Sequence, residues 1–155
     1  LFASALVGDG DAFVAEVDES DGSIASYEPT IAIVNNIALD HKSMEDLRAL
    51  FAGFIDRSEI AILNLDNEET AALALGTRRR TITYSLRTPL ADLVAQRVQL
   101  MPDSIAFEVV ERANGVKASV MLEVTGEHNV ANALAALAAA RAYGLSLEDA
   151  AVALQ

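Results

Sequence analysis

The sequence predicts an α/β fold in which a mostly parallel sheet is flanked by helices and carries a small antiparallel subsheet. Short apolar and β-branched runs alternate with helical patterns, as they do in strand–helix–strand units. Two of these runs, 31–35 and 60–65, are continuously apolar, which is typical of parallel strands covered on both faces. Residues 81–124 instead hold strand-like runs separated by turn residues, and we expect the antiparallel subsheet there.

The first half of the chain contains three further predicted elements. Residues 12–17 (AFVAEV) form a short apolar run that ends in acidic residues, and we expect a strand there. Residues 44–55 show a helical repeat of apolar side chains. The side chains on that helical face are Leu47, Leu50, Phe51 and Phe54. Residues 66–75 predict a short helix with Asp66 as its N-cap.

The second half continues with strands and ends with helices. The expected strands are 81–86, 93–100, 104–112 and 117–124. The pair Asn114-Gly115 between the last two is a strong hairpin signal. From about 129 to 143 the chain is alanine-rich and helical, and Gly144 marks the end of that helix. Ser146 then caps a last helix.

Composition limits the class of protein. The 155 residues suit a single domain, 1–155, and the 52% apolar content is enough for a packed core. Both ends begin or stop inside an apolar or helical pattern, so we expect a truncated piece of a larger protein. The longest apolar stretches, such as 130–140, are too short to span a bilayer, so no membrane partner is expected.

The net charge and the absence of cysteine limit which partners and which chemistry the chain can have. The net charge of −12 argues against a broad nucleic-acid surface, and we interpret the one basic cluster, Arg78-Arg79-Arg80, as a solvated turn. The chain has no cysteine, which excludes disulfides, thiolate metal sites and cysteine nucleophiles. This fits a reducing compartment, and we expect a cytoplasmic location.

The first candidate cluster is 16–21 (EVDESD), at the end of the predicted strand 12–17. Ligands of open α/β sheets bind at the carboxyl ends of strands. Glu16 alternates with Ala15 and Val17, so it is able to face a cleft while they pack. A carboxylate in that place is suited to hold Mg²⁺. The alternative is an acidic, solvated turn.

The second cluster is 35–41 (NNIALDH), directly after the apolar run 31–35. His41 is one of two histidines in the chain, and Asp40 precedes it and is placed to orient its ring. The alternative is an ordinary polar loop.

The third cluster is 126–132 (GEHNVAN), at the start of the alanine-rich helix. Asn129 and Asn132 are three residues apart and share a helix face. Two carboxamides on one face can read both the donor and the acceptor of an adenine edge. The alternative, a helix cap followed by a tolerated polar position, explains Asn129 but gives no reason for Asn132.

Several motifs are absent from the chain. None of the eight glycines is followed by lysine, so the sequence has no G-x-x-x-x-G-K-[ST] phosphate loop. It also has no G-x-S-x-G or H-E-x-x-H motif.

The three clusters, in this order, resemble the central ATP-binding domain of the Mur ligases, nearest the UDP-N-acetylmuramate–L-alanine ligase branch. The resemblance is carried by 13–21 (FVAEVDESD), 29–41 (PTIAIVNNIALDH) and 126–136 (GEHNVANALAA), and it extends from about Gly10 to Leu154. It departs from the branch after Asp21, where Gly22-Ser23-Ile24 follow, and after His41, where Lys42-Ser43-Met44 follow.

The resemblance implies site residues by position. Glu16 and His41 would serve magnesium and catalysis. His128, Asn129 and Asn132 would bind the adenine of ATP. Asn36 would approach the muramyl substrate.

The resemblance also implies a reaction and partners. The expected cofactors are ATP and Mg²⁺, and the expected substrates are UDP-N-acetylmuramate and an amino acid, L-alanine by the branch. The phosphate loop, an N-terminal UDP-binding domain and a C-terminal amino-acid domain would lie outside these residues. Two alternatives stay open: the branch that attaches a recycled tripeptide to the same nucleotide sugar, and a non-catalytic nucleotide-binding module derived from such a ligase.

Overall fold

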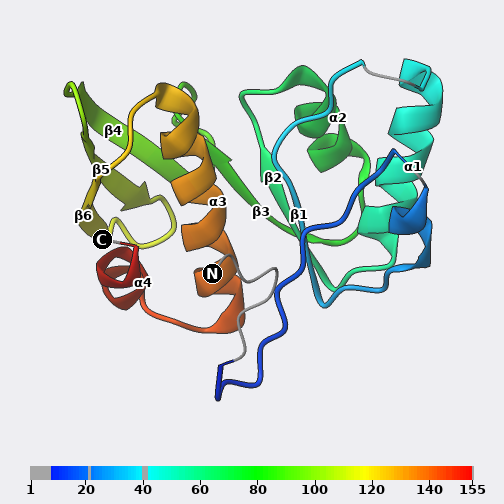
Figure 1. The fold of residues 1–155 in the computed structure, drawn as a ribbon, viewed down its shortest axis with the longest axis horizontal. Coiled ribbons are helices and arrows are strands. Elements are labelled where there is room, and N and C mark those ends of the chain that lie inside the picture. The colour runs from blue at the N-terminus through cyan, green and yellow to red at the C-terminus, as the bar shows by residue number, and fades with distance from the viewer. Residues whose placement is uncertain (1–7, 21, 40–41, 155) are drawn as a thin grey trace, which may run out of the picture.

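The computed structural model describes residues 8–20, 22–39 and 42–154. Within them the strands form one six-stranded sheet in the order β1-β2-β3-β4-β5-β6 (Figure 1). Their bounds are β1 Ile31–Val34, β2 Ile60–Asn64, β3 Arg80–Ser85, β4 Leu93–Leu100, β5 Ile105–Glu111 and β6 Lys117–Leu122. The helices are α1 Met44–Asp56, α2 Glu68–Gly76, α3 Glu127–Tyr143 and α4 Leu147–Ala153, with a 3₁₀ turn, η1, over Ser23–Ser26.

The predicted mixture of parallel and antiparallel pairing is confirmed. β1, β2, β3 and β4 pair in parallel, and β4–β5 and β5–β6 pair antiparallel. The antiparallel part continues the same sheet and begins at Leu93 rather than at residue 81, because β3 is parallel to both of its neighbours. In β4 the register shifts between Gln96 and Gln99, and Arg97 takes a left-handed φ of 54° in this bulge.

The expected strand over 12–17 is wrong. These residues take no regular structure, and Phe13 and Val14 are 92% and 89% exposed. An apolar run becomes a strand only when a neighbouring strand accepts its backbone hydrogen bonds, and β1 pairs with β2 alone among the described residues. The expected two-sided cover of 31–35 is also incomplete, since Ile33 on this end strand is 40% exposed.

The helices of the first half start at side-chain caps. Ser43 accepts a hydrogen bond from the backbone N–H of Asp46 and begins α1, in which Leu47 and Phe54 are buried as expected. The predicted cap of α2 is wrong, because Asn67 and not Asp66 accepts from the N–H of Thr70. Asp66 instead accepts hydrogen bonds from the Ser85 hydroxyl and from the Leu86 N–H, at 2.6 Å for the latter. It therefore ties the loop after β2 to the loop after β3.

The two C-terminal helices match the prediction closely. Gly144 ends α3 with a φ of 111°, a conformation that favours glycine. Ser146 then caps α4 by accepting from the Asp149 N–H. No helix in the described ranges has the length and hydropathy needed to cross a membrane.

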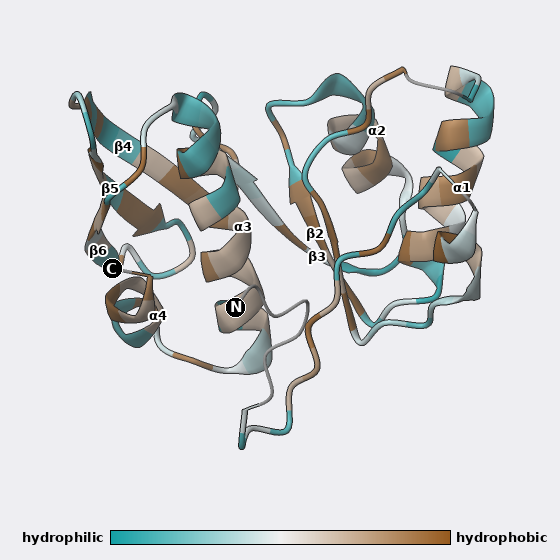
Figure 2. Ribbon diagram, in the orientation of Figure 1, coloured by the Kyte–Doolittle hydropathy of each residue, from teal (hydrophilic) through white to brown (hydrophobic). Residues whose placement is uncertain are grey.

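Two apolar clusters cover the two faces of the sheet. On one face α3 packs over β1 to β5 and α4 packs over β6, around Ile62, Tyr84 and Leu134 (Figure 1). On the other face α1 packs against β1 and α2 packs against β2, around Ala61, Leu63 and Phe54. Figure 2 shows the apolar colouring concentrated along the strands and the lower part of α3, while the first turn of α3 is hydrophilic. The carboxyl ends of the parallel strands therefore meet a polar helix end.

We expect Asp92→Asn to lower the free energy of unfolding at pH 7 by about 1 kcal/mol, because this carboxylate joins β3 to the start of β4 and is partly exposed. Asp92 Oδ2 accepts from the N–H and the hydroxyl of Thr83, both at 2.8 Å, and Arg112 donates to Oδ1 at 3.1 Å. Burial raises the pKa of Asp92, but these hydrogen bonds outweigh it and lower the pKa overall.

The difference between wild type and Asp92→Asn should depend on pH. A carboxyl with a lowered pKa in the folded state stabilises the protein above its unfolded pKa of about 3.9, and this contribution is lost as the pH falls toward the folded pKa. Urea titrations at pH 7 and at successively lower pH measure it. If the difference in the free energy of unfolding between wild type and Asp92→Asn grew as the pH fell, the assignment would be contradicted.

Candidate functional site

The structure brings the second and third sequence clusters together. Asn35, directly after β1, donates from Nδ2 to Oδ1 of Asn132 in α3 at 3.3 Å. The buried Tyr84 of β3 donates from its hydroxyl to Oδ1 of Asn35 at 2.9 Å. The carboxyl ends of two parallel strands and the first turns of α3 therefore form one polar site, as expected for ligand sites of open α/β sheets.

The two predicted adenine-binding amides lie on neighbouring turns of α3. Asn129 is inside the helix and is not its cap; its Nδ2 donates to the carbonyl of Thr125 at 2.7 Å. Asn132 is exposed, and its Nδ2 lies 3.5 Å from Oδ1 of Asn129. The cap interpretation of Asn129 is wrong, because Gly126 occupies the N-cap position.

Gly126 and His128 shape the entry to this helix. Gly126 has a φ of 96° and a ψ of 130°, a combination that is open only to glycine. A Cβ at this position would overlap Cε1 of His128 and lie 2.7 Å from its Nδ1. The exposed His128 ring therefore lies against the Gly126 backbone, one turn before Asn132.

The structure places the predicted magnesium residues only in part. Glu16 is exposed on the irregular segment before η1, and His41 lies outside the described residues. Lys42, the next residue, donates from Nζ to the carbonyls of Glu19 at 3.0 Å and Ser20 at 2.6 Å. The loop that follows β1 is thus held against the acidic segment that follows Glu16.

A magnesium site is not complete in the described part of the chain. No group of three or more acidic, histidine or cysteine side chains converges there. Asn36, the predicted substrate residue, is exposed beside Asn35. Glu16 supplies one carboxylate, so the other ligands of a magnesium ion would have to come from elsewhere.

Sequence reasoning missed Asn35 and Tyr84 as site residues. Asn35 belongs to the cluster 35–41, but a role was assigned to its neighbour Asn36 and none to Asn35. Tyr84 lies in a β-branched run that reads as ordinary core. The available signal was a tyrosine inside the predicted strand 81–86, because a buried tyrosine hydroxyl usually has a hydrogen-bond partner.

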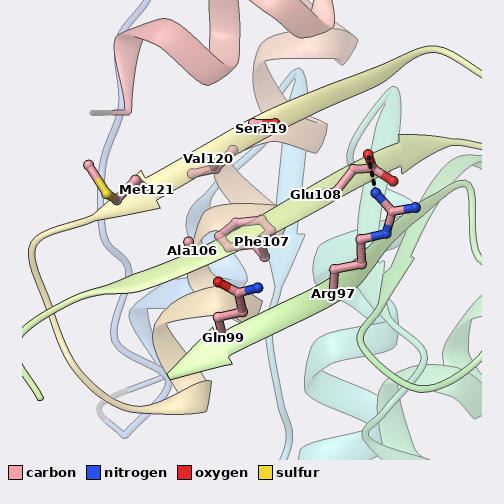
Figure 3. A pocket seen from close by; sticks show the side chains of 8 residues that line it. All are labelled: Arg97, Gln99, Ala106, Phe107, Glu108, Ser119, Val120 and Met121. Atoms are coloured by element: carbon pink, nitrogen blue, oxygen red, sulfur yellow. Dashed lines mark ion pairs between the residues drawn. The ribbon is translucent and has the colours of Figure 1, made fainter. Parts of the chain in front are cut away.

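Two hollows occur elsewhere on the surface. One lies on the face of β4, β5 and β6 that points away from α3, where Arg97 forms an ion pair with Glu108 at 3.7 Å (Figure 3). Lys117 also pairs with Glu108, at 3.1 Å. The other lies beside Asp56, Gly76, Arg78 and Arg79, where Arg79 donates to the carbonyl of Asp56. The predicted site residues line neither hollow.

Comparison with known proteins identifies the family. The family model described as the Mur ligase middle domain matches residues 1–140. This chain therefore belongs to the Mur ligase middle-domain family, in agreement with the resemblance of its three clusters.

The named relatives are ligases of one kind. The chain is 38% identical over 159 residues to a UDP-N-acetylmuramate--L-alanine ligase of Pelotomaculum thermopropionicum, covering 98% of this chain and 34% of the relative. It is 40% identical over 150 residues to the enzyme of the same name from Desulfosudis oleivorans, covering 92% and 32%. The chain thus spans about a third of the length of these relatives.

Solved structures show the same fold. MurF from Acinetobacter baumannii superposes with a TM-score of 0.72 at 26% identity, over 86% of this chain and 30% of that protein. The UDP-N-acetylmuramate-alanine ligase MurC from Thermotoga maritima has a TM-score of 0.71 at 20% identity, over 85% and 30%.

We expect Gly126→Ala to destabilise the fold by about 1–2 kcal/mol, since the added Cβ meets the His128 ring and the backbone there is open only to glycine. Gly76→Ala is the matched control: a Cβ at Gly76, the last residue of α2, meets nothing within 4 Å. That control should be neutral or stabilising, because alanine is the better helix former. Unfolding in urea compares the two; equal free energies would contradict the role of Gly126.

Proposed function

We propose that this chain is the ATP-binding middle domain of a ligase that joins an amino acid, L-alanine, to UDP-N-acetylmuramate in the synthesis of peptidoglycan precursors. The whole-chain similarity to relatives named for that activity supports the substrate pair. The proposal places the protein in the cytoplasm, where the nucleotide substrates are available.

The observation that carries the nucleotide part of the proposal is the pair Asn129 and Asn132. Their side chains lie in hydrogen-bond contact at the carboxyl edge of the parallel strands. A primary amide has two N–H donors and two acceptor lone pairs, and the contacts to Thr125, Asn129 and Asn35 use only some of them. The remaining donor and acceptor match the paired acceptor and donor of an adenine edge. His128 lies beside them and completes the proposed base site.

The proposed reaction has two steps. A carboxylate oxygen of UDP-N-acetylmuramate attacks the γ-phosphorus of ATP, which forms an acyl phosphate and releases ADP. The amine of the amino acid then attacks the acyl carbon, forms the amide bond and displaces phosphate. This chain would supply the base site, while a phosphate loop and N- and C-terminal domains would hold the phosphates and the other substrates.

The proposed reaction includes Mg²⁺, which the resemblance to the Mur ligases implies as a cofactor. The ion would neutralise charge on the transferred phosphoryl group. Glu16 and His41 are the proposed ligands from this chain, and further ligands would come from the nucleotide, water or other parts of the protein. Asn36 is proposed to approach the muramyl substrate.

The rival substrate is a recycled tripeptide. One solved structure with the same fold is a murein peptide ligase from Psychrobacter arcticus, with a TM-score of 0.71 at 24% identity. The relatives named for L-alanine favour the amino acid. Release of phosphate by the full-length protein, measured with UDP-N-acetylmuramate, ATP and either L-alanine or the tripeptide, separates the two. Absence of turnover with both would favour a non-catalytic nucleotide-binding module.

We expect Asn132→Ala to raise the KM for ATP in the full-length protein. Loss of amide hydrogen bonds to the base should cost about 1–3 kcal/mol of binding, or roughly 5- to 150-fold. The same change should alter the free energy of unfolding by less than about 1 kcal/mol, because alanine favours the helix. GTP is the internal control, since its guanine edge carries the opposite pattern. An unchanged ATP to GTP preference would remove Asn132 from the base site.

We expect Glu16→Gln to reduce turnover in the full-length protein without lowering the melting temperature. The substitution keeps the shape of the side chain and removes the charge proposed to hold magnesium, an effect worth several kcal/mol in a transition state. His41→Ala should also reduce turnover. Glu28→Gln, at another exposed acid, is the control. Near-normal activity of both site variants at limiting magnesium would exclude the two ligands.

A further inference from the structure

Four hydrogen bonds connect β3 to the loop before α3 through the base site. The Tyr84 hydroxyl donates to Asn35 Oδ1 at 2.9 Å, and Asn35 Nδ2 donates to Asn132 Oδ1 at 3.3 Å. Asn132 Nδ2 donates to Asn129 Oδ1 at 3.5 Å, and Asn129 Nδ2 donates to the Thr125 carbonyl at 2.7 Å. In every bond of this series the residue nearer to Tyr84 donates and the residue nearer to Thr125 accepts.

The direction of the series is fixed at its last member. A backbone carbonyl only accepts, so Asn129 must turn its Nδ2 to Thr125 and its Oδ1 to Asn132. Asn132 must then turn its Nδ2 to Asn129 and its Oδ1 to Asn35. Asn35 in turn presents Nδ2 to Asn132 and Oδ1 to Tyr84.

The first member of the series has to be a donor, and Tyr84 meets that requirement. Its side chain is fully buried in the core beneath α3. Burial, together with the nearby carboxylate of Asp66, raises the pKa of the hydroxyl, so the phenol keeps its proton at neutral pH. A buried hydroxyl without an acceptor would be destabilising, which gives Tyr84 a reason to hold Asn35 in one orientation.

We propose that Asn35 and Tyr84 are positioning residues that fix which way the Asn132 amide faces and thereby favour adenine over guanine. This inference rests on the proposed function, because it assumes that Asn132 contacts the base of the nucleotide. An amide turned by 180° exchanges its donor and its acceptor. Adenine and guanine also differ by an exchange of donor and acceptor on their base-pairing edges. The orientation of the Asn132 amide therefore determines which of the two bases is preferred.

Asn35→Asp is the decisive variant because it inverts one bond with almost no change of shape. A carboxylate has no N–H, so it cannot donate to Asn132 Oδ1, and two oxygens would face each other. The favoured response is rotation of the Asn132 amide, which conflicts with Asn129 and Thr125. We expect the ratio of kcat/KM for ATP to that for GTP to fall about tenfold or more, through KM and not through kcat. The added charge acts equally on the two nucleotides and cancels in this ratio.

Tyr84→Phe tests the first bond of the series while it keeps the ring in the core. We expect a fall of about two- to fivefold in the same ratio, because Asn35 loses its donor and gains freedom to turn. Tyr143→Phe, at the exposed end of α3, is the matched control and should leave the ratio unchanged. A purely structural role of Tyr84 would lower the melting temperature and leave the ratio of the two nucleotides at its wild-type value.

The outcomes separate the inference from the function on which it rests. The full-length protein, Asn132→Ala and Asn35→Asp are compared for ATP and GTP in one assay. If Asn132→Ala lowers the ratio and Asn35→Asp does not, the positioning role is wrong and the base site stands. If Asn132→Ala itself leaves the ratio unchanged, the base site is wrong. A lowered ratio in both variants, with kcat retained in Asn35→Asp, supports the inference.

Discussion

The packing of α3 across one face of the sheet is the contact on which the rest of this structure depends. Six buried side chains of the helix pack over β1 to β5, and three of the six are alanines, which allow close approach: Val130, Ala133, Leu134, Ala135, Leu137 and Ala138. Burial of each Leu or Val side chain in this contact contributes roughly 1.5–3 kcal/mol. The same contact sets where the first turn of α3 lies, and with it Asn129 and Asn132.

The polar edge of the sheet is held by a few side chains that join neighbouring loops. Asp66 connects the loop after β2 to the loop after β3 through Ser85 and Leu86. Lys42 holds the loop after β1 against the acidic segment through the carbonyls of Glu19 and Ser20. These contacts place loop residues from distant parts of the sequence along one edge. A rigid sheet with polar loops at this edge is suited to bind a nucleotide, because the fold positions the groups before the ligand arrives.

Regular elements with their own local signals were predictable. The repeat of Leu47 and Phe54 identified α1, and Gly144 and Ser146 marked the end of α3 and the start of α4. Predictions failed where a partner from elsewhere in the chain decides the outcome. Residues 12–17 have the composition of a strand but no pairing strand among the described residues, and Asp66 bonds to the distant Ser85 instead of capping α2.

The sequence by itself determined the fold class, the family and the adenine-binding candidates. Periodicity, caps and a short motif such as 126–136 are local properties of the sequence, so they can be interpreted without the tertiary structure. Only the tertiary structure decided that Asn35 bonds to Asn132 and Tyr84 to Asn35, because those contacts join residues 97 and 49 positions apart. The direction of their hydrogen bonds follows from one backbone carbonyl, that of Thr125, and no pattern in the sequence carries that information.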